Sequence, residues 1–207
     1  YGLREFCKSV IGDLQNRCKN YCYKVRLEKT VQYAKENGYD AFTTTLLVSP
    51  YQNHQALKEI CEELSEKYDL RPAVGLAAPQ LGILKKMIAI VAPDESGNEH
   101  EFALINPKLL SYSDELTYLE GGEGCLSVDR ACDAYIHRPA RVMFEAYFYD
   151  LETGKLEKKR MKLKGYLSVV FQHEYDHLNG ILFVDRANKT NPKHIPDNSK
   201  PIQFKEN

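Results

Sequence analysis

Apolar positions in the first third of the chain recur with helical spacing. From Val25 to Asn37, apolar and charged residues alternate as on an amphipathic helix, and Gly38 supplies a stop. A second helix is predicted from His54 to Lys67. Its apolar stripe falls at i, i+3, i+4, i+7 and i+11 and consists of Leu57, Ile60, Cys61, Leu64 and Tyr68. Residues 41–48, rich in β-branched and apolar side chains, predict a buried strand that Ser49-Pro50 ends.

From Arg71 onward the pattern changes to short strands joined by turns. Strands are predicted at 86–92, 102–106, 141–149, 156–163 and 181–184. Pro107 ends the second of these, and Glu152-Thr153-Gly154 predicts a hairpin turn. One helix is predicted from near Tyr166 to just before Gly180, and the tail beyond Asn188 is expected to be irregular. Strands with a single helix among them predict an α+β fold.

That helix contains an HExxH motif, His173-Glu174-Tyr175-Asp176-His177. Residues four apart lie on one helical face, so His173 and His177 can bind one metal ion together. Glu174 then projects beside the ion, where it can accept a proton from water. The alternative is a solvated helix with scattered histidines.

Two histidines supply only part of a catalytic metal site, which needs three protein ligands. Thermolysin-like and metzincin sites take their third ligand, a Glu or a His, downstream of the motif. Here the only candidates there are His194 and Glu206, so the sequence does not favour either arrangement. Upstream, Glu123-Gly124-Cys125-Leu126-Ser127 places a thiol in a Gly-rich loop. Cys125 is therefore a candidate ligand, its alternative being a small buried hydrophobic residue.

A third segment, Val74-Gly75-Leu76-Ala77-Ala78-Pro79-Gln80, combines small residues with an amide donor. Small residues allow a substrate to approach the backbone closely, and Gln80 can donate a hydrogen bond. Alone, this segment could equally be a close-packed turn.

Length, charge and cysteine content limit the classes of partner and the cellular setting that the chain suits. The chain has 207 residues, is 43% hydrophobic and carries a net charge of −1, which suits one core or one core plus a small appendage. This overall balance favours neither a nucleic-acid partner nor an acidic membrane surface. No apolar run approaches the ~20 residues that span a bilayer. Six cysteines are too sparse for a disulfide scaffold, so metal or thiol roles and an intracellular setting are expected.

Together, the three segments resemble peptide deformylase. The family pattern is GxGLAAPQ, then EGCLS, then QHEYDHLxG. This chain has AVGLAAPQ at 73–80, EGCLS at 123–127 and QHEYDHLNG at 172–180, with Ala73 replacing the usual first glycine. The resemblance covers about Glu66 to the C-terminus, in the form found in Gram-positive bacteria. It implies antiparallel sheets around a central HExxH helix, without the usual N-terminal strand and helix.

The resemblance implies a role for each matched residue. Cys125, His173 and His177 would be metal ligands, and Glu174 the general acid/base. Gln80 and the Leu126 N–H would stabilise the formyl oxygen as it gains charge. Substrate-binding positions would be Val74, Gly75, Gly124, Val169 and Val170, where the last two line a methionine pocket or simply pack in the core.

The same resemblance implies the reaction and its setting. The enzyme would remove the formyl group from N-formylmethionyl peptides in the bacterial cytoplasm, near the ribosomal exit tunnel, without a membrane or a sequence-specific nucleic acid. The implied ion is Fe²⁺, although a Cys/His₂ site also suits Zn²⁺, Ni²⁺ or Co²⁺. We expect residues 66–190 to form this domain and 191–207 to form the tail.

The first 65 residues are similar to another family, the iron–sulfur epoxyqueuosine reductases. That family carries RCxxCY, RLExTA and FTTTLLxSPYQN segments, and the match covers about residues 4–64. Here Cys18 and Cys22 are one residue too far apart, and the family's other portions are absent. We expect a mostly helical fragment that is not an independent domain, in a natural fusion or an assembly artefact. Its cysteines would be free thiols or cluster ligands.

Three alternatives to a deformylase remain open. The chain could be an inactive fusion that keeps the motifs, an iron–sulfur redox enzyme acting through its first segment, or an HExxH endopeptidase. The segment before about Leu64 is expected to contribute no catalytic residue to deformylation.

Overall fold

The computed structural model describes residues 3–38, 41–42, 44, 52–68, 71–72, 74–128, 132–150 and 153–205. The chain divides into two compact units, Tyr1–Ala73 and Val74–Asn207, each with its own hydrophobic cluster. Of the strand predicted at 41–48, only Ala41, Phe42 and Thr44 are described; its stop at Ser49-Pro50 lies outside the described residues, as does Ala73. Within the described ranges, no helix is long and apolar enough to cross a bilayer.

The first unit is mostly helical, as predicted. Its helices are α1 (Leu3–Val10), a π-helical turn (Cys18–Cys22), α2 (Tyr23–Glu36) and α3 (His54–Tyr68). Two short strands, β1 (Ala41–Phe42) and β2 (Arg71–Pro72), pair in parallel. Both predicted long helices are thus confirmed, and Gly38 with φ 72° follows α2 as a glycine stop should.

Helices α2 and α3 bury their apolar stripes in one cluster. Leu57, Ile60 and Leu64 of α3 lie in this cluster with α2, and Leu57 is fully buried. The α2 side contributes Leu27 and Val31, also fully buried. Each such side chain stabilises the unit by about 1.5–3 kcal/mol. The stripe read from the sequence of α3 therefore packs within its own unit.

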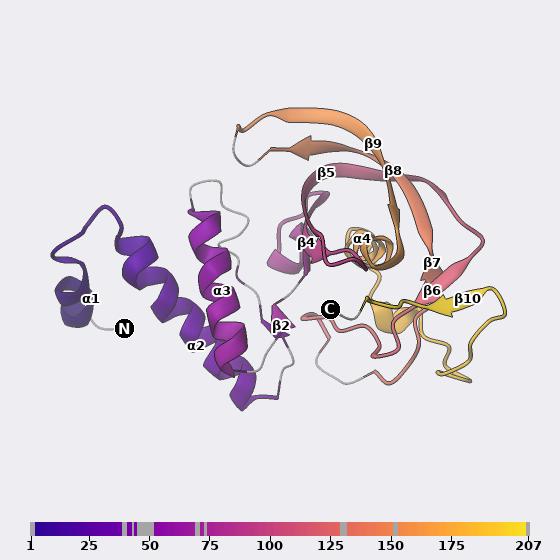
Figure 1. Ribbon diagram of the computed structural model, residues 1–207, viewed down its shortest axis with the longest axis horizontal. Coiled ribbons are helices and arrows are strands. Elements are labelled where there is room, and N and C mark those ends of the chain that lie inside the picture. Colours follow the sequence, from indigo (N-terminus) through magenta and orange to yellow (C-terminus); the bar gives the residue numbers. More distant parts are fainter. Residues whose placement is uncertain are drawn as a thin grey trace. The chain divides into compact units, whose positions relative to one another are not determined.

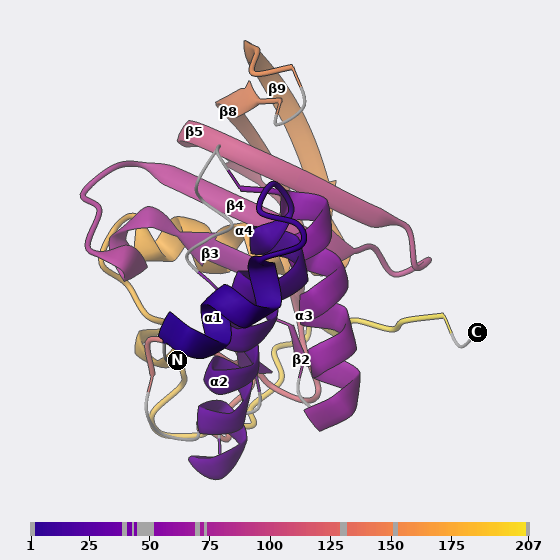
Figure 2. The same cartoon turned by 90° about the vertical axis from the view of Figure 1, so that its left-hand side faces the viewer.

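The second unit is built from two sheets and one long helix. A five-stranded antiparallel sheet has the order β3–β4–β5–β8–β9 (Figure 2). Its strands are β3 (Gly75–Ala77), β4 (Met87–Pro93), β5 (Glu99–Tyr112), β8 (Arg141–Tyr149) and β9 (Leu156–Lys164). The second sheet has the order β10–β6–β7, formed by β10 (Ser199–Pro201), β6 (Leu116–Tyr118) and β7 (Arg138–Pro139).

Helix α4 (Gly165–His177) carries the HExxH motif and contacts strands of both sheets. Figure 1 shows it end-on beside the strands of the larger sheet. Leu167, Val170 and Phe171 pack into the main core, where the rings of Phe171 and Phe144 stack with centroids 4.2 Å apart. Gly180, with φ 70°, closes the turn after the helix by donating its N–H to His177 O. The helix that positions the histidines is therefore anchored by the core.

Strand β5 corrects the prediction that Pro107 ends a strand at Asn106. The strand continues to Tyr112, with a register shift between Ile105 and Lys108 where it pairs with β8. Asn106 has φ 50° at this point. A bulge leaves a residue unpaired, so proline, which lacks an N–H, is tolerated there.

Two further predictions near the C-terminus are wrong. The strand predicted at 181–184 is instead a 3₁₀ turn, Phe183–Asp185, whose Asp185 carboxylate accepts the Leu182 N–H at 2.9 Å. This local bond competes with strand pairing. The tail beyond Asn188 is not wholly irregular, because Ser199–Pro201 pairs in parallel with β6. Pairing with a distant segment leaves no local pattern in a three-residue strand.

The start of α4 depends on a glycine and a carboxylate. Gly165 has φ 54°, and Glu95 Oε1 accepts the Tyr166 N–H at 2.7 Å. A Cβ at Gly165 would lie on top of that carboxylate oxygen, at 1.4 Å. The Glu95 side chain thus takes the space that a side chain at position 165 would fill. It also accepts the Tyr166 N–H, one of the backbone donors that the first helical turn leaves without a partner inside the helix.

We predict that Gly165→Ala destabilises the protein more than Gly97→Ala. Both glycines have positive φ, which costs alanine about 1–2 kcal/mol. Only Gly165 also displaces Glu95, since nothing lies within 4 Å of a Cβ at Gly97. Chemical denaturation of both variants measures the difference. Equal losses in the free energy of unfolding would show that the Glu95 contact does not stabilise α4.

Candidate metal and catalytic centre

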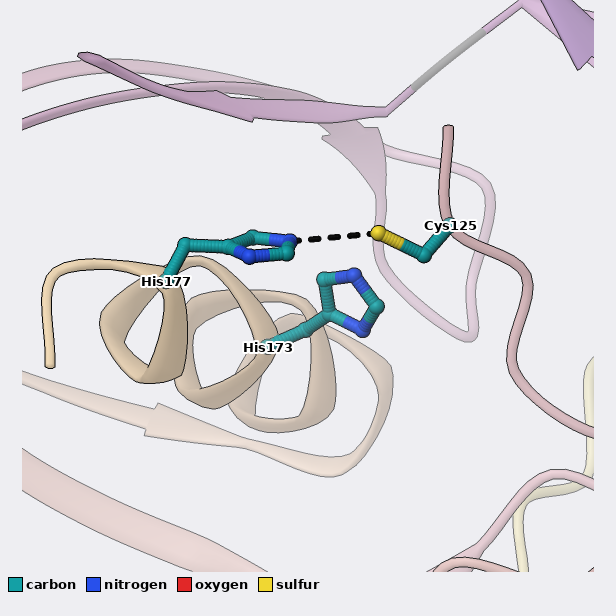
Figure 3. A group of neighbouring side chains, drawn as sticks. All are labelled: Cys125, His173 and His177. Atoms are coloured by element: carbon teal, nitrogen blue, oxygen red, sulfur yellow. Dashed lines mark hydrogen bonds between the residues drawn. The ribbon is translucent and has the colours of Figure 1, made fainter. Parts of the chain in front are cut away.

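Helix α4 presents His173 and His177 on one face, as the i, i+4 spacing predicts. Their rings meet edge to face with centroids 5.0 Å apart (Figure 3). His177 is buried and His173 is half-buried. Both rings reach the same point beside the helix.

Cys125 arrives at that point from the loop between β6 and β7. Its Sγ lies 3.3 Å from His177 Nε2, and one possible ligand atom from each of Cys125, His173 and His177 lies within 4.8 Å of the others. The Ser127 N–H points at the same sulfur from 3.4 Å. The structure therefore brings together the three ligands predicted from sequence, from segments about fifty residues apart.

Glu123 fixes the orientation of His173. Its Oε2 lies 2.8 Å from His173 Nδ1, and hydrogen bonds from His173 and Arg138 lower its pKa against the opposing effect of burial. An ionised carboxylate can only accept, so Nδ1 carries the proton and donates it. Nε2 is left for the side where Cys125 lies, the usual arrangement of a metal-binding histidine.

Glu123 is held in turn by Arg138, one of the most deeply buried side chains. Arg138 donates from Nε and Nη2 to the two oxygens of Glu123 at 2.5 and 2.9 Å. Its Nη1 donates to Asp176 at 2.8 Å, inside the HExxH motif. Arg186 adds two more bonds to Asp176. The network ties the cysteine loop to the helix of the histidines.

Sequence reasoning missed this network. Glu123 stands in a motif singled out for its cysteine, and Asp176 stands within the HExxH pentad, yet neither was assigned a role. Arg138 and Arg186 carry no local signal, because their partners are up to 38 residues away.

The electrostatics favour a thiolate. Burial alone would raise the pKa of Cys125, but hydrogen bonds with His173, His177 and the Ser127 N–H lower it to about 6. For His173, burial disfavours the charged form, whereas hydrogen bonds with Cys125 and Glu123 raise its pKa to about 10. Thiolate is the form of cysteine that binds metals.

Glu174 lies buried next to the ligands. Burial raises its pKa to about 7, and its Oε2 has no hydrogen-bond partner among the described residues. Gly75 of β3 leans against it: a Cβ at that position would lie 2.4 Å from Glu174 Oε1. An orphaned buried oxygen costs free energy, and such an atom is typical of a site that acts on something bound there.

Gln80 reaches the site from a 3₁₀ turn, Ala78–Leu81, that follows β3. Its Oε1 accepts the Ala77 N–H at 2.8 Å, which fixes the amide so that Nε2 points inward. Nε2 donates to Ser127 Oγ at 3.0 Å and lies 3.9 Å from Cys125 Sγ. Leu126, next to the cysteine, is 41% exposed. The amide of Gln80 thus lies beside the thiol.

The remaining predicted positions differ in their surroundings. Val74 is half-buried, and its carbonyl accepts the Val91 N–H at 2.9 Å. Gly124 is exposed, with nothing within 4 Å of a Cβ position. Val169 and Val170 are both buried, and Val170 belongs to the main core. Val170 therefore packs in the core, one of its two predicted roles.

The donor set suits a borderline or soft divalent ion. A thiolate and two imidazoles, one fixed by a carboxylate, are ligands that Zn²⁺, Fe²⁺, Co²⁺ and Ni²⁺ accept and that Mg²⁺ and Ca²⁺ do not prefer. Three protein ligands also leave room for water or substrate. The residues present therefore fit a catalytic metal.

Comparison with known proteins identifies the family. The model of the family "Polypeptide deformylase" matches residues 43–193. "Peptide deformylase 2" of Bacillus cereus is 52% identical over 141 residues, which cover 68% of this chain and 74% of that protein. The peptide deformylase of Oceanobacillus iheyensis is 51% identical over 142 residues, 69% of this chain and 75% of that one. A class I type b peptide deformylase structure from Acinetobacter baumannii shares 30% identity over 70% of this chain and 87% of its own, with a TM-score of 0.47.

The chain is a hydrolase of the α+β deformylase fold, and it belongs to the polypeptide deformylase family. Its reaction is the removal of the N-formyl group from nascent proteins, with a metal ion as the family requires. A second family model, "Epoxyqueuosine reductase QueH", matches residues 1–75. The deformylase resemblance is thus confirmed as family membership, and the reductase resemblance is matched by a family model over the first 75 residues. The two matches overlap at 43–75.

We predict that Glu123→Gln lowers metal affinity by about 10–100-fold, the usual cost of losing an outer-shell carboxylate. The amide cannot hold the Nδ1–H of His173 as strongly, so Nε2 becomes a poorer ligand. Competition with a chromophoric chelator measures the affinity. Glu120→Gln, an exposed change in the same loop, is the matched control and should leave affinity unchanged.

Proposed function

We propose that Cys125, His173 and His177 hold one divalent ion and that Glu174 moves the protons of deformylation beside it. One observation supports this above others: the three candidate ligand atoms lie within 4.8 Å of one another, and the neighbouring Glu174 carboxylate is buried, with an oxygen that has no hydrogen-bond partner among the described residues. The ion, when bound, supplies a Lewis acid that activates water and polarises a carbonyl.

Substrate orientation falls to the backbone and amide groups around the ligands. Gln80 Nε2 and the Leu126 N–H are proposed to donate to the formyl oxygen, which gains negative charge as the carbonyl carbon becomes tetrahedral. One such donor is worth about 3–4 kcal/mol. Gly75 on β3, Val74 just before it and Gly124 in the cysteine loop are proposed to line the path of the peptide backbone. Val169 is proposed to form an apolar wall for the methionine side chain, next to Val170, which packs in the core.

Glu174 takes up a proton from water and passes it to the nitrogen of the departing amine. The C–N bond of the formamide breaks, and formate and a free N-terminus leave. Burial of Glu174 keeps its proton affinity in the range where it can both accept and donate near neutral pH. Gly75 holds the carboxylate in place because no side chain separates the backbone of β3 from it.

The setting follows from the substrate. We propose Fe²⁺ as the working ion, with Zn²⁺, Ni²⁺ or Co²⁺ able to bind, and the bacterial cytoplasm as the location. N-formylmethionyl ends appear as chains leave the ribosome, so the region near the exit tunnel is the proposed place of action.

The first unit is proposed to be a partial reductase fragment joined to a deformylase domain at 66–190. Cys18 and Cys22 are half-buried in the π-helical turn, and no described residue forms a metal cluster with them, which favours free thiols. The deformylase match begins at residue 43 and so includes α3. The apolar stripe of α3 nevertheless packs against α2, in the core of the first unit.

We predict that Glu174→Ala keeps its metal and loses turnover by about a hundredfold or more. The carboxylate carries protons and is not a ligand. Formate release from a formyl-methionyl tripeptide, with metal content measured on the same sample, tests both parts. Glu174→Gln keeps the shape of the side chain and should be equally slow; normal turnover in the metal-loaded glutamine variant would rule out the proton-transfer role.

We predict higher activity with Fe²⁺ than with Zn²⁺ when the metal-free enzyme is reloaded without oxygen. The two ions fit the same Cys/His₂ ligands and differ in how readily they change coordination number. Activity per bound ion should fall when the iron enzyme is exposed to air, and the zinc enzyme should not change. Equal activity per ion would contradict the assignment of iron.

A further inference from the structure

The side of the larger sheet away from the core carries concentrated positive charge on β5, β8 and β9. Along β8, Val142, Phe144 and Ala146 are buried, so the alternate residues point to the opposite side. The charged residues of that side on these three strands are six bases and three acids, and two of the acids, Glu99 and Glu101, lie at the start of β5. We call the remaining seven, which lie toward the other end of β5, the basic face: Lys108, Arg141, Lys158, Arg160, Lys162, Lys164 and Glu145.

Strand register brings these side chains into adjacent rows. Lys108 of β5 lies opposite Glu145, and Glu145 lies opposite Arg160. Arg141 lies directly opposite Lys164. Neighbouring rows are about 7 Å apart along a strand and about 5 Å apart between strands. Like charges directly opposite destabilise a sheet, and here the ion pair of Arg141 with Glu115 offsets part of that repulsion while Lys164 has no such partner among the described residues.

Internal carboxylates neutralise only part of the basic face. Glu145 is shared by Lys158 at 2.8 Å and Arg160 at 3.2 Å, and Glu115 pairs with Arg141 at 2.5 Å. Within the described residues, Lys108, Lys162 and Lys164 are exposed and form no ion pair. Because the chain as a whole has a net charge of −1, the remainder of the protein is acidic. The face is a local positive field on an acidic protein.

Protection of a sheet edge explains this charge incompletely. Lysines on an edge strand prevent edge-to-edge association, and β9 is an edge strand. However, Lys108 lies on β5 and Arg141 on β8, both inside the sheet. Membrane-surface binding is also less suited, because it needs apolar side chains that insert beside the charges. Between these bases the face offers Met143 and Ile105, both half-buried, and Tyr147, 38% exposed.

We propose that the basic face binds the phosphate backbone of RNA without sequence preference. The inference rests on the proposed function in one respect, since nascent chains are made on a particle rich in RNA. Rows of cations on a sheet match a polyanion through charge alone, and such contacts position a protein without reading bases. RNA held there would keep the enzyme close to emerging formylated ends.

The test measures binding of a fluorescent mixed-sequence RNA duplex to the metal-loaded full chain across about 50–200 mM salt. Combined Lys108→Gln, Lys162→Gln and Lys164→Gln should weaken binding about tenfold or more at low salt and reduce the salt slope by about 2–3. The matched control changes three exposed lysines elsewhere: Lys85→Gln, Lys189→Gln and Lys205→Gln. It removes the same charge and should retain affinity.

Three further measurements decide the outcome. Lys→Arg changes at the same three positions should preserve RNA binding, which guards against a folding defect in the glutamine variant. Turnover of a free formyl-methionyl tripeptide should be unchanged in all variants, so failure of RNA binding and failure of deformylation are separable. Equal loss in the control triple, no RNA binding by the unaltered chain, or stronger dependence of phosphatidylserine vesicle binding than of RNA binding on these lysines would each overturn the proposal.

Discussion

The catalytic centre depends on one buried cation. Arg138 lies between Glu123 of the cysteine loop and Asp176 of the histidine helix, and each carboxylate accepts its hydrogen bonds away from water. Removing one partner of such a network leaves uncompensated buried charge, which costs about 3–5 kcal/mol. The guanidinium is planar and rigid, so it fixes the loop and the helix in one relative geometry. Cys125 and the two histidines meet because this cation holds their supports together.

The elements that depend on neighbouring residues could be predicted from the sequence. The helices α2, α3 and α4 and the strands β4, β8 and β9 follow from apolar periodicity, and the ligands follow from HExxH plus a thiol in a glycine-rich loop. The extent of β5 did not follow, because a bulge at Asn106 rescues Pro107 through its pairing with β8. β10 and the Arg138 network also depend on partners far along the chain, and such partners leave no periodic trace.

The charge of the whole chain and the charge of one folded surface differ in the same way. A net charge of −1 for the whole chain indicates no polyanionic partner, yet strand register gathers six bases around Glu145 on one side of a sheet, while Glu99 and Glu101 lie apart at the start of β5. Alternation along β8 and β9 sends apolar residues to the core and charges outward, so the folded surface separates what composition averages. Whole-chain totals and folded surfaces can therefore point to different partners.

The contact between Gly75 and Glu174 restricts how this protein can evolve. The Glu174 carboxylate rests against the backbone of Gly75, and backbone atoms do not change when side chains are substituted, so its position is insulated from most substitutions on β3. The same insulation makes Gly75 itself irreplaceable, because every other residue brings a Cβ into the carboxylate. An inhibitor that contacts the backbone of Gly75 would be hard to escape by mutation. A side chain at position 75 that blocked the inhibitor would also displace the Glu174 carboxylate.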